Sequence, residues 1–560
     1  MIGLSQKTVT YSICAILLLA ASLRFYGLTE RGIFDYDEAW YLLESKSLYD
    51  GVGFIFDKAT GVQTDDTSLK AYLKERGNTP ITSFKPGHTL LVFLGFLVLG
   101  VHDYASFGVS ALLGTLTVWI LYRLGRLMFD DRVGLLAALI LAVSTFHIGY
   151  ARSGYAQAKA IFFIALGVYL WFASTTHEDR KKLFLSGLSI GYGFSCHFNL
   201  FTIPLAIAGL EAYHQHQSGT NISDRFRQMC RLGLGMANPL IAFELPARIL
   251  SLFGKLPEGQ LSYAEQYFYR GQLTSLLHFS LAGGSALADK LWVAEGPLVV
   301  LGLIAGLGVA LRRIKDLRHV ALILLFLLPA LPWSILSVGL PPLYRTFSVL
   351  SVPVSLLAAL GLVRMIDAIG ANRSPTRGRG YQVVCVGVLA VGVGLAAGLL
   401  SLRSTYREAT DAWMAYAQEH GGQIDILPGS SFPIWYFYLS TRYDSLPEDT
   451  RNDIGFYPGQ KDLMPPLGAY DVIDEKRYMK AVRTGRDDLM AYLDRLSAAR
   501  PAVVFPNPVA HLPDRYREIG GTGILEEMAR IRSKRGSGYV TVVDLRVESD
   551  TEWRMAEVSR

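Results

Sequence analysis

Long apolar runs constrain the fold of this chain more than any other feature. They occupy roughly the first 400 of its 560 residues, and about 20 consecutive apolar residues are enough to cross the core of a bilayer. The chain is 51% hydrophobic with a mean hydropathy of +0.28, unlike a soluble globular protein of this length. The runs expected to span a membrane are 9–28, 104–123, 133–150, 157–174, 183–198, 200–214, 232–253, 296–311, 319–338, 347–364 and 381–401. We therefore expect a polytopic α-helical membrane protein with about 11 transmembrane helices.

The loops between these runs predict the orientation of the chain. Every second loop is short and basic, and such loops face the cytoplasm. The basic residues are Arg123, Arg126 and Arg132; Arg180, Lys181 and Lys182; Arg225, Arg227 and Arg231; Arg312, Arg313, Lys315 and Arg318; and Arg364, Arg373, Arg377 and Arg379. The N-terminus is then cytoplasmic, and an odd number of spans places the C-terminal part outside. Because the basic residues fall in these short clusters, the net charge of +6 does not indicate binding to nucleic acid.

The first external loop, residues 29–103, is expected to contain helices that lie at the membrane surface. Its apolar run 88–101 has only about 14 residues, which is short for a span. A crossing there would also turn all later basic loops outward. We therefore predict a half-buried interfacial helix at this run. A second surface helix is predicted over 37–48, where aromatic and apolar residues mix with Glu44 and Lys46.

The expected domains are a transmembrane domain, residues 1–403, and an external soluble α/β domain, residues 404–560. The second has the composition of an ordinary soluble protein. Short apolar runs predict strands at 424–427, 502–505 and 539–545, and helices are predicted at 408–420, 487–499 and 525–532. This alternation of strands and helices is typical of a small α/β layer.

An acidic cluster, Asp35-Tyr36-Asp37-Glu38, follows the first span at the membrane surface. Carboxylates held there between aromatic residues cost desolvation energy, which points to a functional role. A structural interpretation carries about equal weight: Asp35 can cap the next helix, with Glu38 completing a capping box.

Other polar residues on the external side shift the balance towards function. Lys85, Arg152 and Arg345 each follow or precede an apolar run at the same membrane depth. Each alone could be a snorkelling anchor, but together they suit a phosphate at the headgroup level. Residues that could contact a substrate nearby are His88, Tyr344, Glu265 and Arg270.

This combination of charges suggests glycosyl transfer from a lipid phosphate. The cations would neutralise the departing phosphate, and a carboxylate would take the proton of the acceptor hydroxyl. This carboxylate is expected to come from the acidic cluster 35–38. The donor phosphate is assigned to Lys85, Arg152 and Arg345.

The segment Leu23–Leu28, followed by Asp35–Trp40, resembles the start of the family 39-like glycosyltransferases of the GT-C fold. These include protein O-mannosyltransferases and the aminoarabinose transferases of lipid A. The resemblance covers roughly residues 9–370. It implies a GT-C transmembrane domain whose first external loop carries an Asp-Glu pair with a catalytic Asp, which aligns with Asp37 and Glu38.

Three further motifs carry the resemblance. Lys85-Pro86-Gly87 resembles the Lys-Pro-Pro that ends the loop in the aminoarabinose branch, Ala151-Arg152 resembles an Ala-Arg motif after the third span, and Arg345 resembles an Arg before a span that contains proline. The departures are Gly87 for the second Pro, Phe84 where Glu is usual, and Tyr155, Ala156 and Gln157 where an Asp is usual. The first two argue against aminoarabinose transfer to lipid A.

We therefore expect an integral membrane glycosyltransferase that uses a polyprenyl-phosphate monosaccharide and a glycan, lipid or protein acceptor, in a bacterial or archaeal plasma membrane. The resemblance implies that no metal or cofactor is needed, and no pair of the four cysteines has metal-ligand spacing. The alternative is a transporter or flippase of a lipid-linked glycan. A transporter would be expected to have charged residues inside several spans and internal repeats, whereas the spans here look nearly free of charge.

Overall fold

The computed structural model describes most of the helical part of the chain and selected segments of the C-terminal part. The described residues are 5–34, 36–62, 66–69, 72–73, 85–177, 179–197, 202–252, 282–335, 344–369, 374–401, 403–404, 406–407, 410–411, 414–415, 418, 432–454, 502–505, 526–530 and 541–544. The chain divides into two compact units. The first unit comprises Met1–Leu28, Thr82–Leu91 and Phe107–Ser401, and the second comprises Thr29–Ile81, Val92–Ser106 and Leu402–Arg560.

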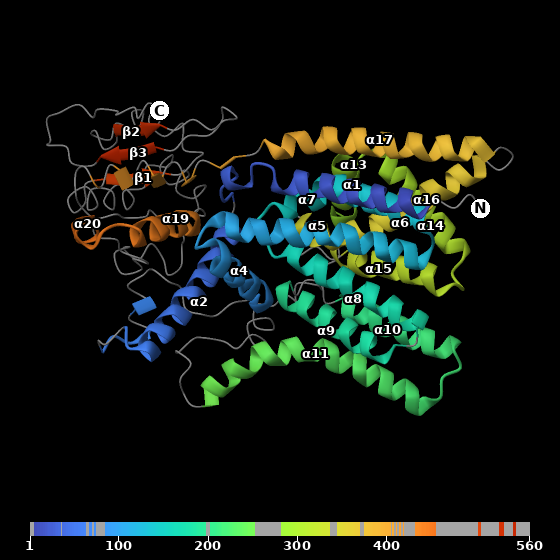
Figure 1. Ribbon diagram of the computed structural model, residues 1–560, viewed down its shortest axis with the longest axis horizontal. Helices are drawn as coiled ribbons and strands as arrows, with labels where there is room; N and C mark the ends of the chain where they lie inside the picture. The colour runs from blue at the N-terminus through green and yellow to red at the C-terminus, as the bar shows by residue number, and fades with distance from the viewer. Residues whose placement is uncertain are drawn as a thin grey trace. The chain divides into compact units, whose positions relative to one another are not determined.

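The first unit is a bundle of helices (Figure 1). Its helices are α1 (Gln6–Phe25), α6 (Asp131–Val143), α7 (Thr145–Ala151), α8 (Gln157–His177), α9 (Arg180–Cys196), α10 (Thr202–Gln217), α11 (Ile222–Leu252), α13 (Ala282–Glu295), α14 (Pro297–Arg312), α15 (Leu317–Ile335), the 3-10 helix η4 (Tyr344–Leu350), α16 (Ser351–Ile369) and α17 (Ser374–Leu400). Two more helices, α4 (Pro86–Leu99) and α5 (Asp103–Met128), contribute residues to both units.

Every predicted span coincides with a helix, and the chain is a multi-pass membrane protein. Five helices in the described part of the chain are long and apolar enough to cross a bilayer on their own; α6 and α7, bent by 62°, together make a sixth if they form one span. The predicted interfacial run is the separate 14-residue helix α4. The total of 11 spans stays a prediction.

Glycines allow the close approach of α14 and α16. A Cβ atom added at Gly302, Gly306 or Gly361 would collide with the backbone or side chains of the facing helix. Small residues of this kind let membrane helices pack backbone to backbone. Gly302, Gly306 and Gly361 therefore serve helix packing.

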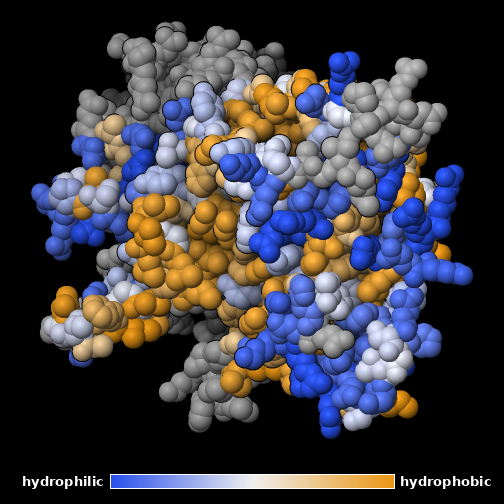
Figure 2. All heavy atoms as spheres, turned by 45° about the vertical axis from the view of Figure 1, so that its right-hand side comes forward, coloured by the Kyte–Doolittle hydropathy of each residue, from blue (hydrophilic) through white to orange (hydrophobic). Residues whose placement is uncertain are grey.

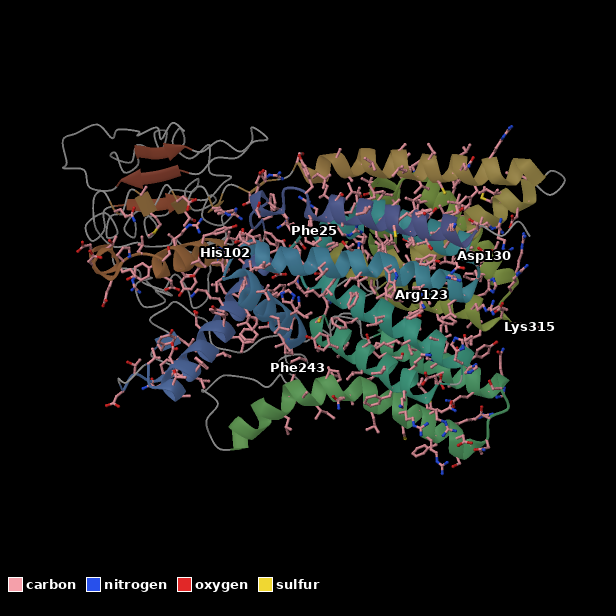
Figure 3. All side chains as sticks on the ribbon, in the orientation of Figure 1. Phe25, His102, Arg123, Asp130, Phe243 and Lys315 are labelled. Atoms are coloured by element: carbon pink, nitrogen blue, oxygen red, sulfur yellow. The ribbon has the colours of Figure 1, made fainter. Side chains whose placement is uncertain are left out.

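The surface of the helices matches a lipid environment. Figure 2 shows broad apolar areas on the molecule, and exposed apolar side chains are frequent on α11 and α17, among them Phe226, Leu234, Ile241, Val383 and Val386. In Figure 3, Arg123, Asp130 and Lys315 lie at one end of the helices of the first unit, and Phe25 lies at the other. The basic loops thus gather at one end, as the positive-inside pattern predicts.

The second unit combines helices with a small sheet. It contains the 3-10 helix η1 (Leu28–Glu30), α2 (Tyr36–Thr60), α19 (Phe432–Asp444), α20 (Glu448–Ile454), and strands β1 (Ala502–Phe505), β2 (Glu526–Arg530) and β3 (Thr541–Asp544). The strand order is β1-β3-β2, and both pairs are antiparallel. Helix α19 packs against α2 (Figure 1). Lys46 of α2 is nearly buried between Asp50, at 2.8 Å, and Asp444 of α19, at 3.1 Å.

Several predicted elements of the second unit can be compared with the structure. Strands β1 and β3 confirm the runs 502–505 and 539–545. The predicted helix 525–532 is wrong: its residues favour helix, but pairing with the valines of β3 makes them strand β2. Helix α2 begins as predicted but continues to Thr60.

The other predicted elements of the C-terminal part fall largely on residues that the structure does not describe. The segments 424–427 and 487–499 lie outside the described residues. The predicted helix 408–420 is described in part, and its residues 410, 411, 414, 415 and 418 are helical.

Candidate active site

Glu38 of the acidic cluster binds the preceding loop, residues 29–34, in the second unit. This carboxylate is fully buried and accepts hydrogen bonds from the Arg31 guanidinium at 2.8 and 3.3 Å and from the backbone N–H of Phe34 at 2.9 Å. Glu38 thus reaches back from the first turn of α2, much as in a capping box. The structural interpretation of the acidic cluster therefore holds for Glu38, although Asp35 lies outside the described residues.

Asp37 stands beside Glu38 in the first turn of α2 and remains partly exposed. Because the two carboxylates differ in exposure, they suit different roles. The buried Glu38 orients the loop, whereas Asp37 is the better candidate for contact with a substrate.

A basic cluster of four residues, Lys85, His88, Lys159 and His197, lies in the first unit. Lys85 precedes α4, His88 lies in its first turn, Lys159 lies in the first turn of α8, and His197 caps α9. His88 and Lys159 are fully buried. Lys159 donates hydrogen bonds to Ser110 Oγ at 2.7 Å and to the carbonyl of Tyr155 at 3.3 Å.

Direct packing of α4 on α9 holds the cluster together. The Tyr192 hydroxyl donates to the carbonyl of Gly87 at 3.0 Å, and a Cβ at Gly87 would collide with Ser195 Oγ. Glycine is therefore required where the aminoarabinose branch has its second proline. On the other side, the amide nitrogen of Gln157 and Nε2 of His197 share a hydrogen bond of 3.0 Å.

The charge of the cluster rests on its lysines. Burial, and then the basic groups of Lys159, Lys85 and His197, lower the pKa of His88 well below its usual value. His88 is therefore neutral at physiological pH. Two ammonium groups beside the neutral imidazole of His88 form an environment that suits a phosphate or another anion.

Arg152 is hydrogen-bonded to the backbone at the end of α1. Its Nη1 donates to the carbonyls of Leu23 and Arg24 at 3.2 Å and of Tyr26 at 2.6 Å, and its side chain is buried. These carbonyls lie at the C-terminal end of a helix, where a cation is favoured.

Arg24, near the end of α1, binds the carbonyls of another helix. It donates to the carbonyls of Leu141 and Ala142 at the end of α6, both at 3.0 Å, and shares a 2.9 Å hydrogen bond with Nδ1 of His147. Arg152 thus caps the end of α1, and Arg24 of α1 caps the end of α6 at its bend to α7.

The remaining predicted site residues are described less fully. Tyr344 and Arg345 begin η4, but only their backbone is described, and Glu265 and Arg270 lie outside the described residues. The convergence of Lys85, Arg152 and Arg345 on Asp37 stays a prediction.

Sequence reasoning missed Lys159, Gln157 and His197. The signal for Lys159 was present: a lysine stands at the third position of the predicted span 157–174. The expectation of nearly uncharged spans is wrong here, because Arg24, Lys159 and Glu211 are all buried within helices of the bundle. Within the described ranges, no three His, Cys, Asp or Glu side chains are grouped to hold a metal ion, and independence from metal stays an expectation.

Comparison with solved structures decides the fold. The chain matches ArnT from Cupriavidus metallidurans, solved bound to undecaprenyl phosphate, with a TM-score of 0.57 at 14% identity, over 98% of this chain and 100% of that chain. The chain has the GT-C fold. It also matches the archaeal oligosaccharyltransferase AglB from Archaeoglobus fulgidus, solved with an inhibitory peptide and a dolichol-phosphate, with a TM-score of 0.54 at 12% identity, over 97% of this chain and 75% of that chain.

Sequence comparison gives shorter matches. The family model for dolichyl-phosphate-mannose-protein mannosyltransferases matches residues 82–223, which include the whole basic cluster. An uncharacterized protein of Aquifex aeolicus is 28% identical over 176 residues, which cover 31% of this chain and 31% of that protein. The resemblance to the GT-C glycosyltransferases that the motifs suggest is confirmed.

Proposed function

We propose that this GT-C protein is a membrane glycosyltransferase that moves a monosaccharide from a polyprenyl-phosphate donor to an acceptor hydroxyl on the external face. The observation that carries the proposal is the basic cluster of Lys85, His88, Lys159 and His197, of which all but Lys85 are buried. The fold supports it, because ArnT has been solved with undecaprenyl phosphate and AglB with a dolichol-phosphate.

The proposed reaction needs only charges and one base. The acceptor oxygen attacks the anomeric carbon, its proton passes to the Asp37 carboxylate, and the bond between that carbon and the phosphate oxygen breaks. The bonding electrons leave with the polyprenyl phosphate, which thereby gains about one negative charge. Preorganised cations stabilise this developing charge more than the charge of the bound donor, so they accelerate the bond-breaking step.

The finer assignments follow the sequence motifs and are part of the proposal. Lys85, Arg152 and Arg345 bind the donor phosphate, Asp37 is the base and Glu38 orients it. His88, Tyr344, Glu265 and Arg270 contact the substrates. The chain crosses the membrane 11 times, with a cytoplasmic N-terminus and an external α/β domain at 404–560, and the reaction requires no metal or cofactor.

The direct test uses the purified full-length protein in lipid nanodiscs. Undecaprenyl phosphates that carry different radiolabelled monosaccharides are supplied with extracts of membrane glycans, lipids and proteins. The proposal predicts transfer of the label to one acceptor class together with release of undecaprenyl phosphate. Movement of an intact labelled donor between leaflets without cleavage, measured in vesicles, would instead establish the flippase alternative.

A binding measurement isolates the role of the cluster. Undecaprenyl phosphate should stabilise the protein against thermal unfolding, whereas undecaprenol, which lacks the phosphate, should not. Lys85→Gln should weaken this stabilisation. Equal stabilisation by both lipids would contradict a phosphate site.

A further inference from the structure

We infer that Ser404, Arg407 and Tyr438 position the carboxylate loop for catalysis, with Tyr438 as the central positioning residue. The inference rests on the proposed function. It gives the C-terminal part of the chain a role in the reaction itself, and it is built from contacts within the second unit alone.

The loop that leads to the carboxylates, residues 29–34, is held through its backbone. The N–H of Ser404 donates to the carbonyl of Arg31 at 2.7 Å, the N–H of Ile33 donates to the Tyr438 hydroxyl at 2.9 Å, and Arg407 donates to the carbonyl of Thr29. All three partners lie more than about 370 residues away along the chain, so ordering the loop against them costs considerable entropy.

The loop 29–34 and the region of Ser404 approach each other so closely that the loop requires a glycine. Gly32 has a φ of +69°, and a Cβ at this position would lie 2.9 Å from Cβ of Ser404. A side chain there would be strained by its backbone conformation and would push the 404 region away. The loop and the C-terminal segment are therefore fitted to each other at this point.

The Tyr438 hydroxyl connects the loop to Asp103. It accepts from Ile33 and donates to Asp103 Oδ2 at 2.5 Å, and Asp103 is also paired with Arg407 at 2.5 Å. Tyr438 and Asp103 are both buried. Burial, and then the neighbouring Asp103 carboxylate, raise the pKa of Tyr438, so the hydroxyl keeps the proton that it donates.

The loop passes this restraint to the carboxylates. Glu38 holds both Arg31 and the N–H of Phe34, so the loop and the first turn of α2 move together. Asp37 is the neighbour of Glu38 in that turn. A second tie, Lys46 to Asp444, joins α2 to the helix that carries Tyr438. A displacement of about 1 Å at a reacting group can cost about a hundredfold in rate.

The test removes one hydroxyl and compares it with a matched hydroxyl on the same helix. Tyr438→Phe should lower kcat about 10- to 30-fold with the donor KM unchanged within about twofold, because the base is misplaced while the donor still binds. Tyr443→Phe is the control. Its hydroxyl donates to the carbonyl of Arg451 at 3.2 Å, away from the loop, so kcat should stay within about twofold.

A double-mutant cycle separates positioning from general support of the fold. If Tyr438 acts through Asp37, Tyr438→Phe should cost nothing further in an Asp37→Asn background. If the rate losses of the two single variants multiply in the double variant, or if Tyr438→Phe has the wild-type kcat, the inference is overturned. Should Tyr438→Phe not fold, Arg407→Lys replaces it in the same cycle, with an expected loss of about threefold. A wild-type protein that transfers no sugar would instead refute the proposed function.

Discussion

At the scale of single residues, a charged group in this protein can cap a helix or bind a ligand, and the two roles look identical in the sequence. Arg152 and Lys85 both stand at ends of apolar runs that are predicted to be external, yet Arg152 donates hydrogen bonds to the carbonyls that end α1. Side-chain contacts across more than a hundred residues decide between capping and ligand binding. The motif pattern could find these residues but could not separate the two roles.

Substituting Arg152 tests its capping role. Arg152→Gln should destabilise the protein by about 2 kcal/mol, because three carbonyls lose a charged donor in a buried site. Thermal unfolding of the purified protein measures this effect. A variant of wild-type stability would show that the capping contacts contribute little, whatever its binding of undecaprenyl phosphate.

His88 makes stability depend on pH. Its pKa is lowered in the folded protein by burial and by the neighbouring basic groups, so between that value and about 6.5 the unfolded chain binds more protons. Stability is therefore full above about pH 6.5 and falls as the pH drops below it. In melting curves at pH 7.5 and 5.5, His88→Gln should lose less stability on acidification than the wild type; an equal loss would contradict the assignment.

At the scale of elements, long apolar runs predicted the helices of the first unit, and sequence patterns failed where tertiary contacts decide. The short helix α4 could be predicted, because its apolar run is too short to cross a bilayer. The 62° bend between α6 and α7 could not, because no proline or glycine marks it. It is held by Ser144, which caps α7, and by Arg24, which takes the last carbonyls of α6.

The packing of α14 on α16 can be tested with matched glycines. Gly361→Val should greatly reduce the yield of folded protein, because the new side chain collides with the backbone of α14. Gly308→Ala is the control, since a Cβ there meets nothing within 4 Å. Size-exclusion profiles of the detergent-solubilised proteins report the outcome. A monodisperse Gly361→Val protein would contradict the close packing.

At the scale of the whole molecule, the division of the chain into units does not follow its order. Most of the loop that is predicted to be external, residues 29–81 and 92–103, belongs to the same compact unit as residues 402–560. Composition alone indicates a boundary near 403, because it detects the end of the apolar runs. It cannot detect that Arg31 and Ser404 are hydrogen-bonded, since that contact joins opposite ends of the chain.

The orientation of the chain is tested at its C-terminus. The alternating basic loops predict that residue 560 lies outside the cytoplasm. A reporter that is active only in the cytoplasm, fused after Arg560, should be silent, and one that is active only outside should work. The reverse pattern would mean either that the number of spans is even or that the whole chain is inverted, with Asp37 and the basic cluster on the cytoplasmic side.

The central claim is that Asp37 is the base of a sugar transfer from a polyprenyl phosphate, and one substitution tests it most directly. Asp37→Asn keeps the shape of the side chain and removes its basicity, so the transfer rate should fall about 10²- to 10⁴-fold while binding of the donor is retained. Glu38→Gln should lower the rate less than Asp37→Asn and the stability more, because Glu38 accepts hydrogen bonds from Arg31 and from the N–H of Phe34. Asp35→Asn, which alters only an expected helix cap, serves as the control. The measurement is the initial rate of label transfer by each purified variant in nanodiscs. Full activity of Asp37→Asn would contradict the claim.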